Sequence, residues 1–494
     1  MAKYILTRIV KACLSIFVVV SIVIVMLFTM IPRTKVMDLD TSYRKMTGDN
    51  KTVYRLMRYD QLGYLDYVRL SDMCKSEYDD VTACMINGST ENKAVIEKYE
   101  SNGYVIEYLR NGTAYGYHDY NILELVWNFW SNLIVVDNVN AVQDENNPDL
   151  ERKIYIGTDY NGVPAVMGSG TTHKYLIYFD STFPFIHQNW ITFNFGISYP
   201  TKAGSLTTDV INEGQGAQVS ILQTFPTGVE MESPYNQHTA KYKYTLDHLD
   251  MQKFNDNYAD CTSYYESPSM VNTSYIFGII SLIIAYVVAL PAGMSMARNK
   301  DQLIDKIGVV FINVVIAMPS LALIFFIRQI GANFGLPDKF PLLGFKDIRS
   351  YIVPMIILAV LSMPSLMTWM RRYMIDQSNS DYVKFARAKG LSQREIFSKH
   401  IMKNAIIPIV NGIPASVILC ISGALITESA FAIPGMGKML PDAISKMNNN
   451  MVITLTFIFA ALSIFSILIG DLLMVVVDPR IQLATKKGGK KNGK

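Results

Sequence analysis

One segment of the chain, residues 381–404, gathers side chains whose types and spacing suit the docking of another protein. Asp381 can cap a short helix, and Gly390 follows that helix where a left-handed end is needed. Ser392 and Glu395 have the spacing of a capping box, which begins a second helix. Two short helices that meet at a glycine corner predict a rigid surface that fits a groove of a partner protein. A basic loop that touches anionic lipid is the alternative interpretation.

The first of these two helices is expected to run to Lys389 and to have one distinct side. Tyr382, Phe385, Ala386 and Lys389 recur at helical spacing, so their side chains share a face. The wider segment 371–404 carries eight Lys or Arg residues. These cations predict that the corner is held at the cytoplasmic surface of a membrane.

Enzymatic chemistry is not indicated. A nucleotide-binding loop needs Gly-x-x-x-x-Gly-Lys-Ser/Thr, and residues 435–438 have neither that spacing nor the hydroxyl. The sequence shows no metal-ligand cluster or catalytic-triad spacing in residues 32–274, and no paired Asp or Ser/His set within its apolar segments. We therefore expect no catalytic residue, no metal site and no cofactor bound by this chain.

The elements that must position the basic segment are apolar. Six segments contain no Asp, Glu, Lys, Arg or His and are long enough to cross the roughly 30 Å hydrocarbon core as helices. They are 12–31, 275–297, 307–327, 351–370, 405–427 and 451–470. Their prolines fit spans whose freed backbone groups are satisfied by neighbouring helices: Pro291, Pro319, Pro354, Pro364, Pro408 and Pro414. A buried helix of a soluble protein is the alternative for any single segment, most of all for 405–427.

Few polar residues interrupt these spans. Asn313 and Asn411 could line a path through the membrane, although hydrogen bonds between packed helices are the alternative role. Asp471 follows the last apolar run and is expected to pair with a basic residue at the inner surface. The first span lacks a small-residue cleavage site, so we interpret it as a retained signal anchor.

Charge orients the spans. With a cytoplasmic N-terminus, the inner segments 1–11, 298–306, 371–404 and 471–494 carry three, three, eight and six Lys or Arg. The short outer loops 328–350 and 428–450 carry four and two. The positive-inside rule therefore predicts both termini in the cytoplasm of a multi-pass plasma-membrane protein. Residues 32–274, with 31 acidic and 19 basic residues, are then extracellular.

The segment 32–274 is too long and too aromatic for a disordered linker. Residues 174–179 and 190–195 have the aromatic and β-branched content of strands, and residues 120–136 suit a helix on the domain or membrane surface. We expect a mixed α/β fold. Its three cysteines allow at most one disulfide, and Cys74–Cys84 is a candidate that spacing alone cannot establish.

The segment 381–408 resembles the coupling-loop motif of binding-protein-dependent ABC importers, in the form seen in dipeptide and oligopeptide permeases. That form reads approximately D-Y-V-x-x-A-R-A-K-G-L-S, followed by H-x-x-x-N-A-x-x-P. The matching residues are Asp381, Tyr382, Val383, Ala386, Arg387, Ala388, Lys389, Gly390, Leu391, Ser392, His400, Asn404, Ala405 and Pro408. The broader importer motif begins E-A-A, whereas this chain has Lys384-Phe385-Ala386. That departure indicates the peptide branch and not the sugar branch.

Two further segments are similar to the same family. Glu428, Phe431, Pro434, Gly435 and Gly437 match E-x-x-F-x-x-P-G-x-G, which in the family lies at the outer mouth of the pathway. Asp478-Pro479-Arg480 is similar to the D-P-R ending after the last span, and Arg371-Arg372 also fits. The long insertion resembles the Ami-type oligopeptide permeases of streptococci and related Gram-positive bacteria, specifically the C-type, or B-position, subunit. His173–Leu176 and Phe183–Asn189 look like that group as well.

The resemblance implies a type I ABC importer permease that takes up oligopeptides. Its parts would be a cytoplasmic N-terminus and first helix (1–31), an extracellular domain (32–274), a permease core (275–477) containing the coupling loop 381–404, and a basic tail (478–494). Implied partners are a second permease subunit, two ATP-binding subunits that hold ATP and Mg, a lipid-anchored extracellular peptide-binding protein, the oligopeptide and membrane lipid. No nucleic acid is expected. Dipeptides, nickel chelates and peptide pheromones stay open as cargoes, and a membrane sensor with an external ligand domain is the rival class.

Overall fold

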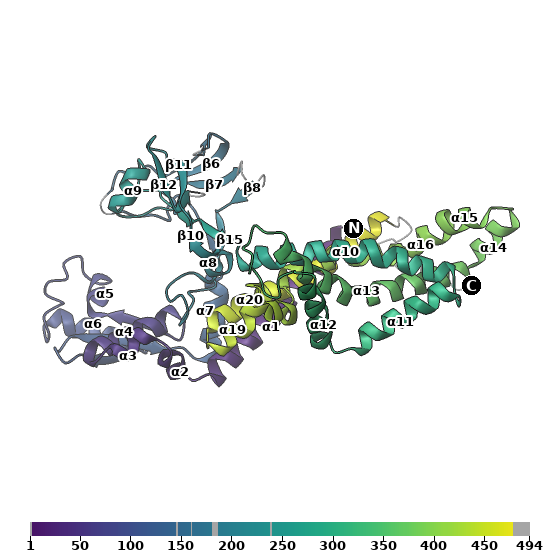
Figure 1. The fold of residues 1–494 in the computed structure, drawn as a ribbon. Helices are drawn as coiled ribbons and strands as arrows, with labels where there is room; N and C mark the ends of the chain where they lie inside the picture. Colours follow the sequence, from purple (N-terminus) through teal and green to yellow (C-terminus); the bar gives the residue numbers. More distant parts are fainter. Residues whose placement is uncertain (1, 145–146, 160, 180–185, 238–239, 478–494) are drawn as a thin grey trace, which may run out of the picture. The chain divides into compact units, whose positions relative to one another are not determined.

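The computed structural model describes residues 2–144, 147–159, 161–179, 186–237 and 240–477 (Figure 1). The chain divides into two compact units. The helical unit comprises Met1–Val20, Ser267–Asp442 and Leu455–Lys494, and the mixed unit comprises Ser21–Glu266 and Ala443–Thr454. Helices α1 (Ala2–Met30), α19 (Met436–Ser445) and α20 (Asn449–Val477) contribute residues to both units.

The remaining helices of the helical unit follow in chain order. They are α10 (Met270–Arg298), α11 (Leu303–Ala317), α12 (Ser320–Asn333), α13 (Arg349–Ser378), α14 (Asp381–Ala388), α15 (Gln393–Glu395), a π-helix (Ile396–Met402), α16 (Lys403–Ala405), α17 (Ile407–Leu419), a 3-10 turn (Cys420–Ser422) and α18 (Leu425–Phe431). Within the residues that the structure describes, four helices are long and apolar enough to cross a membrane, and up to six spans result if each of two bent helix pairs counts as one. The four are α1, α10, α13 and α20.

The third predicted span, 307–327, is wrong as a single helix. Helix α11 ends at Ala317, α12 begins at Ser320, and the two axes differ by 110°. Met318, directly before Pro319, is extended at φ −78° and ψ 128°. A proline ring disfavours the helical conformation of the preceding residue, so the chain turns here. Pro291, Pro354, Pro364 and Pro414 do lie inside helices, as predicted.

The fifth predicted span, 405–427, is also interrupted. A 45° bend separates Gln393–Ala405 from Ile407–Ser422, and Pro408 lies in the first turn of α17. Proline is tolerated there because the first N–H groups of a helix have no partner within it. After the 3-10 turn, Gly423 takes a left-handed φ of +73°, which ends the run before α18 begins.

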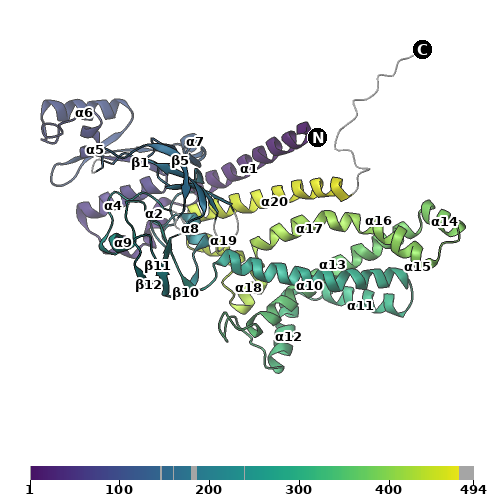
Figure 2. The same cartoon turned by 90° about the horizontal axis from the view of Figure 1, so that it is seen from above.

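Helices α10 and α13 pack closely side by side, as Figures 1 and 2 both show. Ala285, Ala289 and Gly293 recur every four residues along α10 and are buried, so they form a smooth stripe. A Cβ atom on Gly293 would lie only 2.9 Å from the carbonyl oxygen of Met367 in α13. Small residues of this kind allow two helix backbones to approach within a membrane.

Ion pairs join the ends of helices within this unit. Arg371 of α13 donates two hydrogen bonds to the buried carboxylate of Asp305 in α11, at 2.6 and 2.7 Å. The predicted basic partner of Asp471 is Arg8 of α1, with 3.2 Å between the charged groups.

The mixed unit contains helices and strands, in agreement with the predicted mixed α/β content. Strands β1 (Leu65–Arg69), β3 (Ala114–Asp119) and β2 (Val105–Tyr108) form one antiparallel sheet. Strands β5 (Lys153–Thr158), β6 (Pro164–Ser169), β7 (Tyr175–Phe179) and β8 (Ile186–Gln188) form a second. Two-stranded pairs are β4 (Ile134–Val136) with β9 (Ile191–Phe193), β10 (Gln215–Gln218) with β15 (Tyr265–Ser267), β11 (Ile221–Thr224) with β12 (Glu230–Ser233), and β13 (Tyr235–Gln237) with β14 (Cys261–Ser263). Strands β7 and β9 lie within the two segments predicted to be strands.

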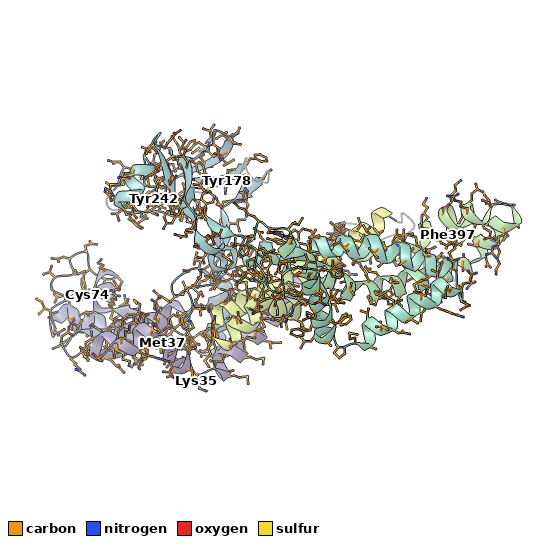
Figure 3. The ribbon with its side chains drawn as sticks, in the orientation of Figure 1. Lys35, Met37, Cys74, Tyr178, Tyr242 and Phe397 are labelled. Carbon is orange, nitrogen blue, oxygen red and sulfur yellow. A yellow bond between two sulfur atoms is a disulfide. The ribbon has the colours of Figure 1, made fainter. Side chains whose placement is uncertain are left out.

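The helices of the mixed unit are short except α4 and α6. They are α2 (Arg33–Asp38), α3 (Thr41–Lys45), α4 (Gly48–Gln61), α5 (Leu70–Lys75), α6 (Thr90–Ser101), α7 (Ile122–Asn132), α8 (Thr207–Asn212) and α9 (His248–Lys253). The candidate disulfide is present, since Cys74 and Cys84 are bonded and fully buried (Figure 3). Their cluster includes Leu70, Met73 and Val95, so the bond lies in a small apolar core.

Three consecutive asparagines at the start of α20 tie distant segments of the mixed unit together. Asn448 donates to the hydroxyls of Ser198 and Thr201, at 2.8 and 2.9 Å. Asn449 donates to the Tyr64 hydroxyl at 2.8 Å, and Asn450 donates to the Ile197 carbonyl at 3.1 Å. Burial raises the pKa of Tyr64 to about 12.

Candidate functional site

The glycine corner of residues 381–404 forms as the sequence predicts. Gly390 has a φ of +76°, a left-handed conformation that ends the turn after α14. Ser392 and Glu395 form a reciprocal capping box, with hydrogen bonds of 3.3 and 3.2 Å between side chains and backbone N–H groups. The Ser392 hydroxyl and backbone N–H both donate to the Glu395 carboxylate, at 2.9 and 3.2 Å, which lowers the pKa of Glu395. The capping box thereby fixes the start of α15. Figures 1 and 2 show α14 and α15 together at one end of the helical unit.

One local detail of this corner differs from the prediction. Ser380, not Asp381, is the residue that precedes α14, and Asp381 is the first residue inside the helix. Its exposed carboxylate accepts a hydrogen bond from Lys384 at 2.8 Å, which lowers the pKa of Asp381. A carboxylate in the first helical turn still interacts favourably with the helix dipole.

The buried side of α14 is narrower than the predicted face. Val383 and Ala386 are buried, and they pack in one cluster with Met370 and Met374 of α13. Phe385, from the predicted face, is 69% exposed. The corner is therefore seated firmly on the end of α13 while it presents an aromatic ring outward.

The remaining residues of the coupling motif are spread along the corner and the helices that follow. Tyr382 is half-buried, and its hydroxyl donates to Gln377 at 2.6 Å. Leu391 is half-buried at the edge of the apolar cluster. Phe397 packs on the same cluster (Figure 3), and Arg298 lies 5.9 Å from its ring. Arg387, Ala388 and Lys389 are exposed, His400 and Asn404 are half-buried, and Pro408 is exposed at the start of α17.

The second motif, residues 428–437, is organised around one buried carboxylate. Glu428 is 4% exposed, and its Oε1 accepts hydrogen bonds from the Ser274 hydroxyl at 2.7 Å and from the Ala424 N–H at 3.0 Å. The Ser274 hydroxyl oxygen in turn accepts from the Met436 N–H at 2.7 Å. Backbone N–H groups of Gly437 and Lys438 also interact with this carboxylate. Glu428 therefore fixes the turn between α18 and α19 against Ser274, near the start of α10.

Close approach explains the two glycines of this motif. A Cβ atom on Gly435 would overlap with the Glu428 carboxylate, and one on Gly437 would lie 2.7 Å from Glu428 Oε2. Phe431 is fully buried in a cluster with Ile324, Phe340 and Ile433. Pro434, which follows Ile433 of that cluster in the sequence, is half-buried. Glu428, Gly435 and Gly437 thus meet in one turn, while Phe431 anchors the end of α18 in the apolar cluster.

A cavity of about 280 Å³ opens beside this turn, within the helical unit. Its polar lining consists mainly of hydroxyl groups, with the Glu428 side chain at one edge, and the rest is apolar. The hydroxyls belong to Ser274, Ser281, Ser362, Ser416 and Thr427. The sequence did not single out Ser274 and Ser281 for this role, although their seven-residue spacing places them on one face of α10.

The two asparagines predicted as possible pathway residues do not share a site. Asn313 lines a different cavity, of about 440 Å³, together with Lys300, Arg371 and Arg372. Asn411 lies against Gly470 of α20, because a Cβ atom added to Gly470 would lie 2.9 Å from the backbone carbonyl oxygen of Asn411. The Asp478-Pro479-Arg480 motif, the basic tail and Phe183 to Phe185 lie outside the described residues.

Comparison with known proteins agrees with these motifs. The family described as binding-protein-dependent transport system inner membrane component matches residues 289–483. The oligopeptide transport system permease protein AmiC of Streptococcus pneumoniae serotype 4 is 41% identical, over 99% of this chain and 100% of AmiC. That alignment therefore includes the long segment 32–274. The dipeptide transport system permease protein DppB of Lactococcus lactis is 31% identical over 42% of this chain and 67% of DppB.

One solved structure, of the inward-facing MetNI methionine ABC transporter, covers 42% of this chain and 94% of that chain at 15% identity and a TM-score of 0.34. A likeness of this size adds no argument about the fold. The sequence relationships are sufficient, because AmiC is matched along its whole length. The chain belongs to the family of binding-protein-dependent transport system inner membrane components, which are integral membrane permeases of ABC importers.

Proposed function

We propose that this chain is one of two permease subunits of an ATP-driven importer of oligopeptides. The full-length similarity to AmiC, a permease of oligopeptide transport, supports the cargo. The similarity to DppB, which belongs to dipeptide transport, keeps shorter peptides within the same proposal. A second permease subunit would supply the other half of the pathway. Two partner ATPases would bind ATP and Mg.

The observation that carries the proposal is the rigid corner formed by residues 381–404. Gly390 and the Ser392–Glu395 capping box fix its shape, and Val383 and Ala386 lock it onto α13. A force applied to the exposed face of α14 by an ATPase would therefore be passed to a membrane-spanning helix and not absorbed by a flexible loop. Nucleotide-driven movement of the ATPases would then shift the spans between inward-facing and outward-facing states.

Contact with the ATPase is proposed for the residues of the coupling motif. Phe385 is the most suitable anchor, because an aromatic ring that is 69% exposed gains from burial in a groove. The exposed cations Arg387 and Lys389 follow Phe385 within the next helical turn.

The proposed topology has six spans, with both termini in the cytoplasm and residues 32–274 outside. Four long apolar helices and two bent pairs are compatible with that number. The Glu428 turn would then lie at the outer mouth, and the hydroxyl-lined cavity beside it would belong to the pathway. Hydroxyl groups both donate and accept hydrogen bonds, which suits the backbone of a passing peptide. The outer domain would hold a lipid-anchored peptide-binding protein.

The first test is Phe385→Asp in the assembled complex, with Lys384→Ala as a matched control on the same helix. We expect Phe385→Asp to reduce copurification of the two ATPases and to abolish peptide uptake, while Lys384→Ala leaves both near the unaltered level. Competition with peptides of graded length would then define the cargo. Normal uptake and normal ATPase binding in the Phe385→Asp variant would refute the coupling role of this corner.

The role of the outer domain needs a separate test. Deletion of most of residues 32–274 should abolish docking of the peptide-binding protein while the ATPases still copurify with the remaining chain. Unchanged receptor docking and peptide uptake after this deletion would contradict the proposed role.

A further inference from the structure

Helix α7 of the mixed unit has no buried side chain, although seven of its eleven residues are apolar or aromatic. A capping box between Asn121 and Glu124 fixes its first turn. Its outward side exposes Leu123 at 81% and Trp127 at 75%, one helical turn apart. An apolar helix face of this size, exposed on a folded domain, indicates a surface that something else covers.

The same apolar surface continues past the end of α7. Strand β4 exposes Ile134 at 55% and Val136 at 54%, and its partner strand β9 exposes Phe193 at 49%. No Lys or Arg occurs between residues 111 and 151. The most exposed large side chains of α7, β4 and β9 are aliphatic or aromatic, with Trp127 among them, and the one acid of α7, Glu124, is held in the capping box. Such a composition is typical of the boundary layer of a membrane.

The depth of α7 relative to the membrane follows from its contact with α1, the first membrane-spanning helix. The indole N–H of Trp130 donates to the hydroxyl of Ser21 in α1 at 3.0 Å. Ser21 precedes Met30, the last residue of α1, by nine residues, which corresponds to roughly 13 Å along a helix. Ser21 also lies inside the uncharged stretch 12–31. A helix that contacts Ser21 is therefore at the depth of the membrane and not above it.

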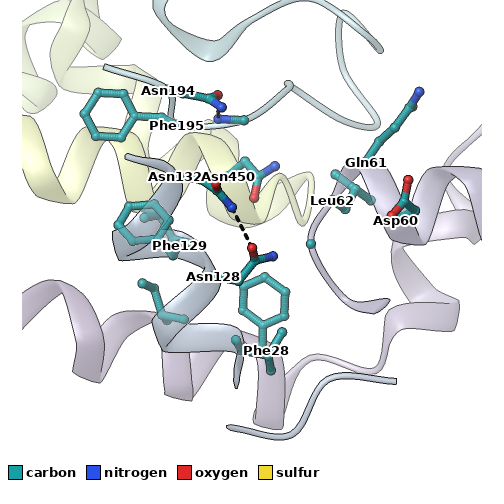
Figure 4. A pocket seen from close by; sticks show the side chains of 15 residues that line it. Phe28, Asp60, Gln61, Leu62, Asn128, Phe129, Asn132, Asn194, Phe195 and Asn450 are labelled. Atoms are coloured by element: carbon teal, nitrogen blue, oxygen red, sulfur yellow. Dashed lines mark hydrogen bonds between the residues drawn. The ribbon is translucent and has the colours of Figure 1, made fainter. Parts of the chain in front are cut away.

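The opposite side of α7 supports this placement. Leu125, Asn128, Phe129 and Asn132 line a cavity of about 160 Å³ together with Ile24 and Phe28 of α1 and Asn450 of α20. Figure 4 shows Asn128, Phe129 and Phe28 around this cavity, with a hydrogen bond of 2.6 Å between Asn132 and Asn128. Asn128 and Asn132 thus line the cavity, whereas the two most exposed apolar side chains of α7 are Leu123 and Trp127.

We propose that α7 is an interfacial anchor, which embeds Leu123 and Trp127 in the lipid of the membrane leaflet next to the mixed unit. The occupant of this surface is lipid because the surface is continuous with α1, which itself exposes Ile22 and Met26 in the same stretch. Aromatic and aliphatic side chains on one face of a short helix are the usual means by which a helix lies in the interface. The identity of the leaflet as the outer one rests on the proposed topology.

The test uses the full chain, assembled with its partner subunits and reconstituted in vesicles of phosphatidylcholine and phosphatidylglycerol. Cys13, Cys261 and Cys420 are first replaced by serine, since these are the free cysteines. An environment-sensitive fluorophore is attached in separate variants at Leu123→Cys, at Trp127→Cys and, as the control, at Leu249→Cys. Leu249 is an equally apolar residue that is 54% exposed on α9. Some vesicles carry a nitroxide high on the lipid acyl chain.

We expect the nitroxide lipid to quench the labels at 123 and 127 several-fold more strongly than the label at 249, with blue-shifted emission at the first two sites. Water-like emission and equal quenching at all three sites would overturn the proposal. Blue-shifted emission without quenching by lipid would also overturn it, because a protein partner would then cover α7. If Trp127→Cys prevents assembly, Leu123→Cys alone decides, since that side chain makes few contacts.

The same samples separate this inference from the proposed topology. A water-soluble quencher added outside the vesicles, or sealed inside them, reports which side the label at 249 faces. Access from the side of the ATPases would refute the proposed orientation of residues 32–274. Lipid quenching at 123 would in that case still support the interfacial helix.

Discussion

Gly435→Ala should disrupt the turn that Glu428 organises. The added methyl group would occupy the place of the Glu428 carboxylate. That carboxylate cannot move freely, because Ser274 and the Ala424 N–H hold it at 2.7 and 3.0 Å. The methyl group therefore displaces a buried acid from its partners and does not merely fill space.

The magnitude follows from the two hydrogen bonds that are lost. A hydrogen bond to a charged group contributes about 1.5 to 3 kcal/mol net, so two bonds set an upper range of about 3 to 6 kcal/mol. Partial relaxation of the turn between α18 and α19 lowers that cost. We expect Gly435→Ala to destabilise the chain by about 3 kcal/mol, a value at the lower end of the range.

A double-mutant cycle isolates the contact. In a Glu428→Ala background no carboxylate is present to collide with the methyl group, so Gly435→Ala should then cost less than about 1 kcal/mol. Gly412→Ala is the control, because Gly412 lies in α17 with open space around an added Cβ. Alanine in a helix is favoured over glycine, so this control should be neutral or slightly stabilising.

The assay is the stability of the purified complex against a graded denaturing detergent, read beside peptide uptake in vesicles. Gly435→Ala should lower both, and Gly412→Ala should lower neither. Equal effects of Gly435→Ala and Gly412→Ala would show that the turn has room for a side chain. An undiminished cost in the Glu428→Ala background would show that the collision with the carboxylate is not the cause.

Three further predictions concern other parts of the chain. Gly390→Ala places an L residue at φ +76°, at a cost of about 1 to 2 kcal/mol, and should lower the amount of peptide taken up per ATP hydrolysed. The control Gly335→Ala, at φ +75°, should leave this ratio unchanged. Equal ratios in the two variants would argue against the coupling role of the corner. Replacing both Cys74 and Cys84 by serine opens a short covalent loop and should cost about 3 kcal/mol, seen as faster proteolysis of the mixed unit, with Cys261→Ser as the control. Burial acts to raise the pKa of Asp40, but hydrogen bonds from Tyr199 and Tyr54 outweigh burial and lower that pKa. Asp40 therefore stabilises the fold above about pH 3.9, the usual pKa of an aspartate in an unfolded chain. This stabilisation is lost as the pH falls through the lower pKa of the folded state. Tyr199→Phe should therefore shift acid unfolding, followed by circular dichroism, to higher pH, while the exposed Tyr244→Phe should not.

Local features of the site were predictable because their interactions span only a few residues. The capping box joins positions three apart, and the left-handed turn at Gly390 depends on one residue type. The lengths of α1, α10, α13 and α20 follow from uninterrupted apolar sequence. The sequence also predicted a helix in residues 120–136, which is correct for Ile122–Asn132 but wrong for Ile134–Val136, a strand, and it paired the correct two cysteines as candidates.

Other features depend on contacts between distant segments, which local patterns do not encode. Glu428 finds its partner in Ser274, 154 residues earlier, and no spacing rule links the two. Val383 is buried against Met370 and Met374 of α13, whereas Phe385 on the same helix is exposed. Which side of α14 is buried therefore depends on its packing against α13. Pro319 could have been accommodated inside a span, as Pro291 is, yet here the chain turns by 110°.

Local sequence patterns were enough to predict the apolar segments, the glycine corner of residues 381–404 and the family that the chain resembles. The hydroxyls that line the cavity beside Glu428, and the contact of α7 with α1 at Ser21, could be seen only in the folded chain. The physical reason is that helix formation and capping depend on neighbours within about one turn. The choice of which face is buried, and against what, depends on residues brought together from hundreds of positions away.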